Sequence, residues 1–182
     1  MKYKKLTGII LKKQNYREAD QILTLWTKQA GKVRALARGV RLLKSKLNFC
    51  LADLGICEID LAGHHGLATL IGVKSIRQFG SLREDLKKAA VAFYAAELML
   101  KMTADEHPNE QAFELLKNFL QELDKAEQIH GHDLIDNFAL NLAQDLGFGS
   151  PKQAQSHSAV VDFVESILDR HLKSEEFMLI IN

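Results

Sequence analysis

Residues 1–80 carry a hydrophobic pattern of period 2, which is typical of β-strands. Strands are predicted at 6–11, 22–27, from 32 onwards, at 56–61 and at 67–73. The polar stretch 12–21, the tetrapeptide 28–31 and the tetrapeptide 63–66 are predicted as turns. In the fourth strand Cys57, Ile59 and Leu61 alternate with Glu58 and Asp60, so the first three are expected to face a core.

From Ser81 the hydrophobic period changes to 3.6, which indicates amphipathic helices. Ser81 and Glu84 have the spacing of a capping box, which predicts a helix beginning there. Four apolar stripes follow: Leu86, Ala89, Phe93, Ala96 and Leu100; Phe113, Leu116, Leu120 and Leu123; Ile135, Phe138, Leu142 and Leu146; Val161, Val164, Leu168 and Leu172. The first helix is apolar around most of its circumference and is expected to be central.

These patterns predict an α+β protein of two domains. Five short strands with small turns suit a five-stranded β-barrel of the oligonucleotide/oligosaccharide-binding (OB) type over residues 1–80. An all-helical domain is expected over residues 81–182, with the boundary near Gly80. The composition, with 47% hydrophobic and 26% charged residues, is that of a soluble globular protein.

The net charge of +1 conceals a strong asymmetry between the two parts of the chain. Residues 1–50 hold thirteen Lys and Arg but only two acids, Glu18 and Asp20, whereas the remaining residues are acidic. In the third predicted strand Lys32, Arg34 and Arg38 share one parity, and small apolar residues occupy the other. The sequence therefore predicts a barrel with a basic face that meets a polyanion.

A nucleic acid is the polyanion that this pattern favours. Cations that contact phosphates, together with aromatic rings that stack on bases, are typical of single-strand binding. Tyr16 and Trp26 are candidate stacking residues; a lone tryptophan in an apolar strand more often belongs to the core, so Tyr16 is the stronger candidate. The predicted contacts are Lys12, Lys13, Tyr16, Arg17, Lys32, Arg34, Arg38, Arg41, Lys44 and Lys46, the last three on an arm expected to be mobile.

Other chemistry has weaker support in the sequence. Glu18 and Asp20 are candidates for a nuclease metal site, but such sites usually need more carboxylates. The pair at 64–65 and the group at 130–133 are histidine-containing candidates for a metal, yet no complete ligand set is evident. Cys50 and Cys57 form no CxxC motif, so we expect reduced thiols in a cytoplasmic protein that has no signal peptide.

The sequence resembles the bacterial RecO family of recombination mediators. The resemblance rests on segments 8–13 (GIILKK), 16–27 (YREADQILTLWT), 31–41 (GKVRALARGVR), 44–45 (KS) and 67–70 (LATL), and on 82–86 (LREDL), 94–98 (YAAEL), 113–116 (FELL) and 137–148 (NFALNLAQDLGF). It implies an OB domain followed by a helical domain, and a non-enzymatic DNA repair factor associated with the nucleoid.

The resemblance also implies partners. Such proteins bind single- and double-stranded DNA, anneal complementary strands, associate with RecR and with the tail of single-strand binding protein, and help RecA to load. Many members carry a four-cysteine zinc finger, but no cysteine follows Gly147 here, so neither zinc nor another cofactor is expected. An RNA-binding OB module, a metal-dependent nuclease and a pure adaptor remain alternative hypotheses.

Overall fold

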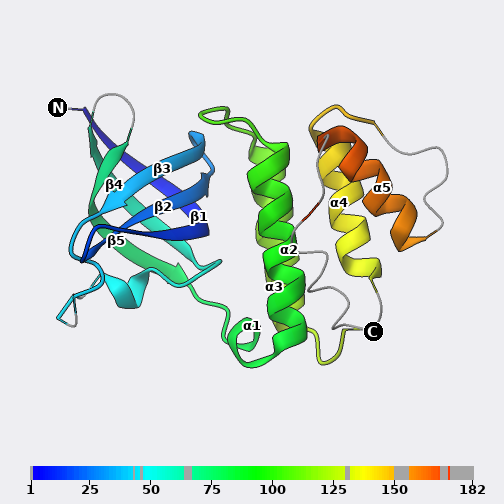
Figure 1. The fold of residues 1–182 in the computed structure, drawn as a ribbon, viewed down its shortest axis with the longest axis horizontal. Coiled ribbons are helices and arrows are strands. Elements are labelled where there is room, and N and C mark those ends of the chain that lie inside the picture. Colours follow the sequence, from blue (N-terminus) through cyan, green and yellow to red (C-terminus); the bar gives the residue numbers. More distant parts are fainter. Residues whose placement is uncertain are drawn as a thin grey trace. The chain divides into compact units, whose positions relative to one another are not determined.

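A computed structural model of the protein describes residues 2–42, 44–45, 47–63, 67–129, 132–149, 156–168 and 172 (Figure 1). Its elements are β1 (Lys2–Tyr16), β2 (Asp20–Thr27), β3 (Gly31–Ala37), the 3₁₀ helix η1 (Asn48–Cys50), β4 (Ile56–Gly63), β5 (Ala68–Arg77), α1 (Ser81–Glu84), α2 (Leu86–Met102), α3 (Glu110–Lys125), α4 (Asp133–Asp145) and α5 (His157–Leu168). The predicted order of strands followed by helices is confirmed.

The five strands form a closed barrel in the order β1-β2-β3-β5-β4 (Figure 1). All neighbouring pairs are antiparallel except β3 and β5, which meet in a short parallel pairing at Ala35 with Ala68 and Leu36 with Thr69. Closure leaves few exposed strand edges. The OB-type barrel predicted from the sequence is therefore confirmed.

The barrel core follows from the alternation of side chains along the strands. The buried cluster is Leu6, Ile10, Leu23, Leu25, Ala35, Ala37, Val40, Leu51, Cys57, Ile59, Leu61 and Leu70. Glu58 and Asp60 lie on the opposite face from their neighbours in β4, as predicted. Burial of this cluster is the main stabilising contribution to the barrel.

The first strand is longer than the sequence pattern predicted. Residues 12–16 continue β1 instead of forming a turn, and only three residues, 17–19, connect Tyr16 to Asp20. A register shift between Ile10 and Lys12 marks a bulge in β1. Beyond the bulge, residues 12–16 are held by main-chain hydrogen bonds to β2. Their side chains can therefore be polar, and this part of the strand shows no hydrophobic alternation in the sequence.

The helical part contains a second core, but its first helix begins later than expected. Asp85, and not Ser81, caps α2, because its carboxylate accepts hydrogen bonds from the amides of Lys87 and Lys88 at 2.8 and 3.2 Å. The hydroxyl of Ser81 instead donates to Asp124 at the end of α3. The predicted capping box is therefore wrong.

The stripes predicted for the last three helices are largely buried. In α2 ten residues are buried, but Ala96 is the one member of the predicted stripe among them, and Leu86 and Phe93 are exposed. The buried face of α2 therefore differs from the predicted one. The rings of Phe119 in α3 and Phe138 in α4 pack with their centroids 4.6 Å apart. No helix among the described residues is long and apolar enough to cross a membrane.

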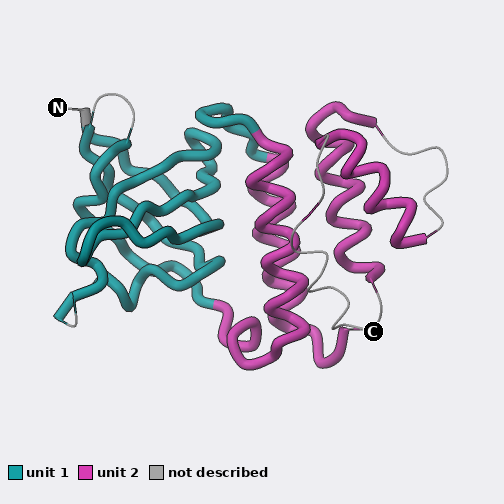
Figure 2. The backbone as a smooth tube through the Cα atoms, viewed as in Figure 1, with its two compact units in different colours: residues 1–78, 104–110 teal, residues 79–103, 111–182 magenta. Residues whose placement is uncertain are grey.

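The chain divides into two compact units, shown in two colours in Figure 2. The first contains residues 1–78 and also 104–110, and the second contains 79–103 and 111–182. The returning segment pairs with the barrel, because the amide of Glu106 donates to the carbonyl of Lys32 at 3.0 Å. Gly31, with a φ of +67°, lies so close that a Cβ there would be 2.2 Å from the carbonyl oxygen of His107.

Candidate nucleic-acid interface

Strand β3 separates its basic and apolar residues as the sequence predicted. Ala35 and Ala37 are fully buried in the barrel core, whereas Arg34 and Arg38 are exposed. Alternate residues of a strand point to opposite faces, so Arg34 lies on the outside of the barrel, and Arg38 is an exposed residue of the turn that follows β3. The short apolar side chains pack inside, and the side chain of Arg34 on the other parity is exposed to solvent.

The strand register brings side chains from three strands into one surface. Thr24 of β2 pairs with both Lys12 of β1 and Arg34 of β3, so these three residues form a row across the barrel. Gln14, Ile22 and Leu36 form the adjacent row. We call these two rows, together with Tyr16, the outer face; Lys12, Gln14, Tyr16 and Arg34 are its exposed members.

The loop after β1 and the turn after β3 are joined by hydrogen bonds. The Nη1 of Arg41 donates to the carbonyl of Glu18 at 3.0 Å, and the amide of Arg41 donates to the carbonyl of Ala19 at 3.0 Å. The carboxylate of Asp20 accepts from the amide of Gly39 at 2.8 Å. The expectation of a mobile arm is therefore wrong for residues up to Arg41, because several hydrogen bonds hold that turn.

Tyr16 and Arg17 lie at the tip of this joined region. The Tyr16 side chain is 37% exposed, and the guanidinium carbon of Arg17 lies 5.2 Å from the centroid of its ring. Arg17 has a φ of +54°, a left-handed conformation that costs a non-glycine residue about 1–2 kcal/mol. Such strain is often found at functional sites, where the surrounding structure holds it.

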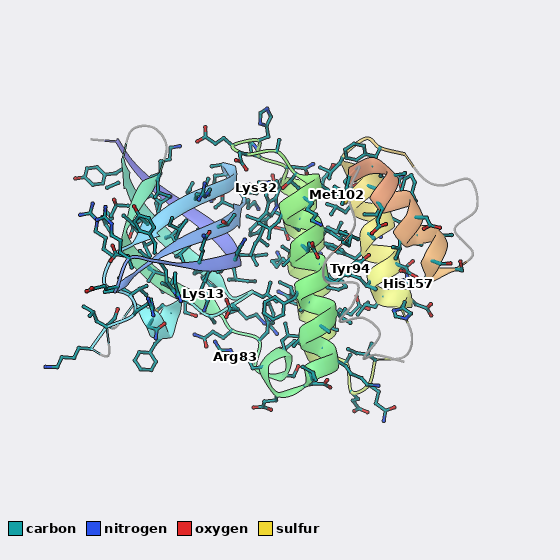
Figure 3. The ribbon with its side chains drawn as sticks, in the orientation of Figure 1. Lys13, Lys32, Arg83, Tyr94, Met102 and His157 are labelled. Atoms are coloured by element: carbon teal, nitrogen blue, oxygen red, sulfur yellow. The ribbon has the colours of Figure 1, made fainter. Side chains whose placement is uncertain are left out.

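Two of the predicted contacts are already paired with acids. The Nζ of Lys13 lies 3.0 Å from the carboxylate of Asp53 and donates to the carbonyl of Leu51 at 3.1 Å. The Nζ of Lys32 lies 3.3 Å from Asp105, and this lysine side chain is only 11% exposed (Figure 3). Their charges are therefore partly neutralised, and both help to hold connecting segments against the barrel.

The remaining predicted contacts differ in their surroundings. Lys44 is exposed, and Lys46 lies outside the described residues. Trp26 is fully buried, so its ring is not accessible for stacking. Exposed cations among the predicted contacts are thus Lys12, Arg17, Arg34, Arg38, Arg41 and Lys44.

Sequence reasoning missed Phe49 in η1, whose side chain is 81% exposed. Its only sequence signal is an aromatic residue within segment 38–52, which holds four cations and no acid.

The acidic and histidine candidates that the structure describes form no metal-binding arrangement. Asp20 is engaged by the Gly39 amide, and no group of three or more His, Cys, Asp or Glu is placed to hold a metal ion within the described part of the chain. His132 stacks on His157 at 3.8 Å between ring centroids, and His157 Nδ1 lies 2.6 Å from Asp136. Residues 64–65 and His130 lie outside the described residues.

Two titratable groups of the barrel are perturbed. The hydrogen bond to Glu58, followed by the charge of this carboxylate, raises the pKa of Lys5. Burial, with a smaller effect of Cys50, raises the pKa of the Cys57 thiol to about 12. Neither group belongs to the outer face.

Known protein families match both parts of the chain. Residues 1–79 match the family model for the recombination protein O N terminal region, and residues 83–160 match that for the C terminal region. An asparaginyl-tRNA synthetase structure from Entamoeba histolytica aligns with 56% of this chain and 31% of its own, at a TM-score of 0.37 and 12% identity, which is too distant to support an argument.

Individual relatives agree with the family match. The DNA repair protein RecO of Anaeromyxobacter sp. (strain K) is 38% identical over 122 residues, which are 66% of this chain and 48% of that protein. The DNA repair protein RecO of Dehalococcoides mccartyi (strain CBDB1) is 35% identical over 144 residues, 79% of this chain and 56% of that protein. The chain spans about half the length of these curated relatives. Because the two family models together match most of its sequence, the chain belongs to the recombination protein O (RecO) family.

Proposed function

We propose that this protein is a DNA-binding repair and recombination factor that contacts DNA through the outer face of its barrel. The observation that carries the proposal is the row formed by Lys12, Thr24 and Arg34, flanked by the joined loops that bear Arg17 and Arg41. The strand register places the exposed cations Lys12 and Arg34 in one row of the barrel surface. The names of the relatives, which are DNA repair proteins, support the same reading.

The contacts act mainly on phosphates. Exposed lysine and arginine side chains neutralise the backbone and release counterions, which gives affinity without sequence preference. Thr24 offers a hydroxyl between the two cations of the row, and Tyr16 offers a ring at its end. A surface of this kind accepts either single or double strands, and the exposed ring favours unpaired bases.

Annealing of complementary strands follows from the same electrostatics. Two strands repel each other through their phosphates, and a protein surface that neutralises both lowers this repulsion. The step forms base pairs and breaks no covalent bond, so we propose a non-enzymatic role.

Family resemblance extends the proposal to partners. We propose that the protein acts with RecR and with the tail of single-strand binding protein, and assists the loading of RecA on DNA coated by that protein. A pull-down with a peptide of the tail tests the second contact directly. Absence of binding by the full chain would remove this partner from the proposal.

The central test is an annealing and binding assay with one charge reversal on each unit. Arg34→Glu on the outer face should lower both the affinity for labelled oligonucleotides of any sequence and the annealing rate, because it replaces a cation by an anion at a phosphate contact. Arg83→Glu in α1 changes the net charge equally at another exposed arginine and should retain both activities (Figure 3).

Two results would contradict the proposal. Equal losses in the two variants would mean that net charge, and not the outer face, determines binding. Preference for an RNA competitor over a DNA competitor of equal length would favour the RNA-binding alternative.

A further inference from the structure

The connection between β3 and β4 presents an aromatic ring to solvent. Phe49 in η1 is 81% exposed, more than any other large hydrophobic residue in the described part of the chain. A ring left in water contributes little to the stability of the barrel, because burial is what makes an apolar side chain stabilising. The ring is therefore available to contact a ligand.

The main chain that carries this ring is held by side-chain hydrogen bonds at Phe49 itself and at Leu51. The carbonyl of Phe49 accepts a hydrogen bond from Nε2 of Gln78 at 2.8 Å, at the end of β5. Two residues later the carbonyl of Leu51, a core residue, accepts from Lys13 at 3.1 Å. A ring projecting from a fixed main chain loses less conformational entropy when it binds than one on a free loop.

The charges of the segment that carries the ring indicate the chemistry of a ligand. Segment 38–52 has four cations and no acid, so it attracts an anionic partner. Arg41 ties the start of this segment to the loop after β1, and Lys13 ties its end to β1 three residues before Tyr16. Both attachments are to the same end of β1 as the outer face, and Lys13 has the opposite parity to Lys12, Gln14 and Tyr16.

We propose that Phe49 stacks on a base of single-stranded DNA held by the outer face, and so extends the binding surface onto the β3–β4 connection. The inference rests on the function proposed above. Cations with a nearby exposed ring match a strand that offers phosphates and unpaired bases at once. In a duplex the base faces are covered by their neighbours, so the ring adds affinity for single strands and leaves phosphate binding to a duplex unchanged.

The test separates base stacking from phosphate binding. Phe49→Ala should weaken binding of an oligothymidine by between about fivefold and about a hundredfold, the range for loss of one base–aromatic stack. Binding of an abasic strand of equal length, which keeps the phosphates but lacks bases, should not change. Phe148→Ala, which removes another exposed phenylalanine, is the matched control and should bind both strands normally.

A second variant reports on the ring directly. In Phe49→Trp the new indole should lose fluorescence when oligothymidine binds, whereas the buried Trp26 supplies a constant background. This signal does not depend on whether Phe49→Ala folds as well as the unmodified protein.

The outcomes distinguish the inference from the function on which it rests. Oligothymidine affinity unchanged in Phe49→Ala, with no quenching in Phe49→Trp, would overturn the inference and leave DNA binding intact. Equal losses on thymidine and abasic strands would also overturn it. If the unmodified protein binds neither strand, the proposed function itself fails.

Discussion

Neutralising Lys12 and Arg34 together should make DNA binding less sensitive to salt. The two side chains share a row with Thr24 and are both exposed, so Lys12→Gln with Arg34→Gln removes two charges from one place. Each phosphate contact adds about −0.7 to the slope of log affinity against log salt for a single strand. The variant isolates the contribution of charge to DNA binding, because glutamine keeps much of the side-chain length.

The structure sets the expected size of the effect. Six predicted contacts are exposed cations, namely Lys12, Arg17, Arg34, Arg38, Arg41 and Lys44. If each meets one phosphate, the slope is about −4, and affinity falls roughly 300-fold between 50 and 200 mM salt. The double variant should have a slope of about −3 and lose only about 50-fold.

Fluorescence anisotropy of a labelled oligothymidine at several salt concentrations measures both slopes. Arg83→Gln with Lys125→Gln is the matched control, since it removes two exposed cations from the helical unit. A double variant with the slope of the unmodified protein, or a control with the shallower slope, would refute the assignment of phosphate contacts to the outer face.

Three further predictions concern the barrel. Asp20→Ala removes the carboxylate that accepts the Gly39 amide, and should lower the free energy of unfolding in urea by about 1–3 kcal/mol. If the unmodified protein cleaved DNA with magnesium and Asp20→Ala did not, the nuclease alternative would be supported instead. Gly31→Ala places a Cβ against the carbonyl of His107 at a positive φ and should cost at least about 2 kcal/mol, seen as a lower Tm. Gly80→Ala meets no atom within 4 Å and should leave the Tm almost unchanged, and an equal loss at both glycines would contradict this reasoning. Because burial raises the pKa of Cys57 to about 12, this thiol should resist iodoacetamide at pH 8 in the folded protein and react after denaturation. Above about pH 9 the unfolded protein loses the thiol proton of Cys57, whereas the folded protein keeps it. The free energy of unfolding should therefore fall by up to about 1.4 kcal/mol for each pH unit in that range. Rapid labelling of native Cys57 would contradict its burial.

Strand alternation and helical periodicity were strong enough to predict the fold. Cys57, Ile59 and Leu61 face the core as their spacing predicted, and Ala35 and Ala37 do so in β3. The failures occurred where the hydrophobic pattern carries no signal. Residues 12–16 are polar on both faces and were predicted as a turn, although main-chain pairing with β2 makes them a strand.

The prediction of where the first long helix begins was wrong for a related reason. Ser81 and Asp85 are both residues that cap helices, and local sequence does not say which one has a competing partner. Ser81 is engaged by Asp124, which is 43 residues away in the chain. Only a contact between distant segments decides between them.

The same division applies to the candidate site. Charge and alternation are local properties, so residue spacing is enough to place Lys32 and Arg34 on a strand with a small apolar inner side. Only the folded protein shows that Lys12 and Arg34 share a row, that acids pair with Lys13 and Lys32, that Trp26 is buried, and that Phe49 is exposed. Each of these depends on strand register or on a partner far along the chain, and neither is encoded by the spacing of neighbouring residues.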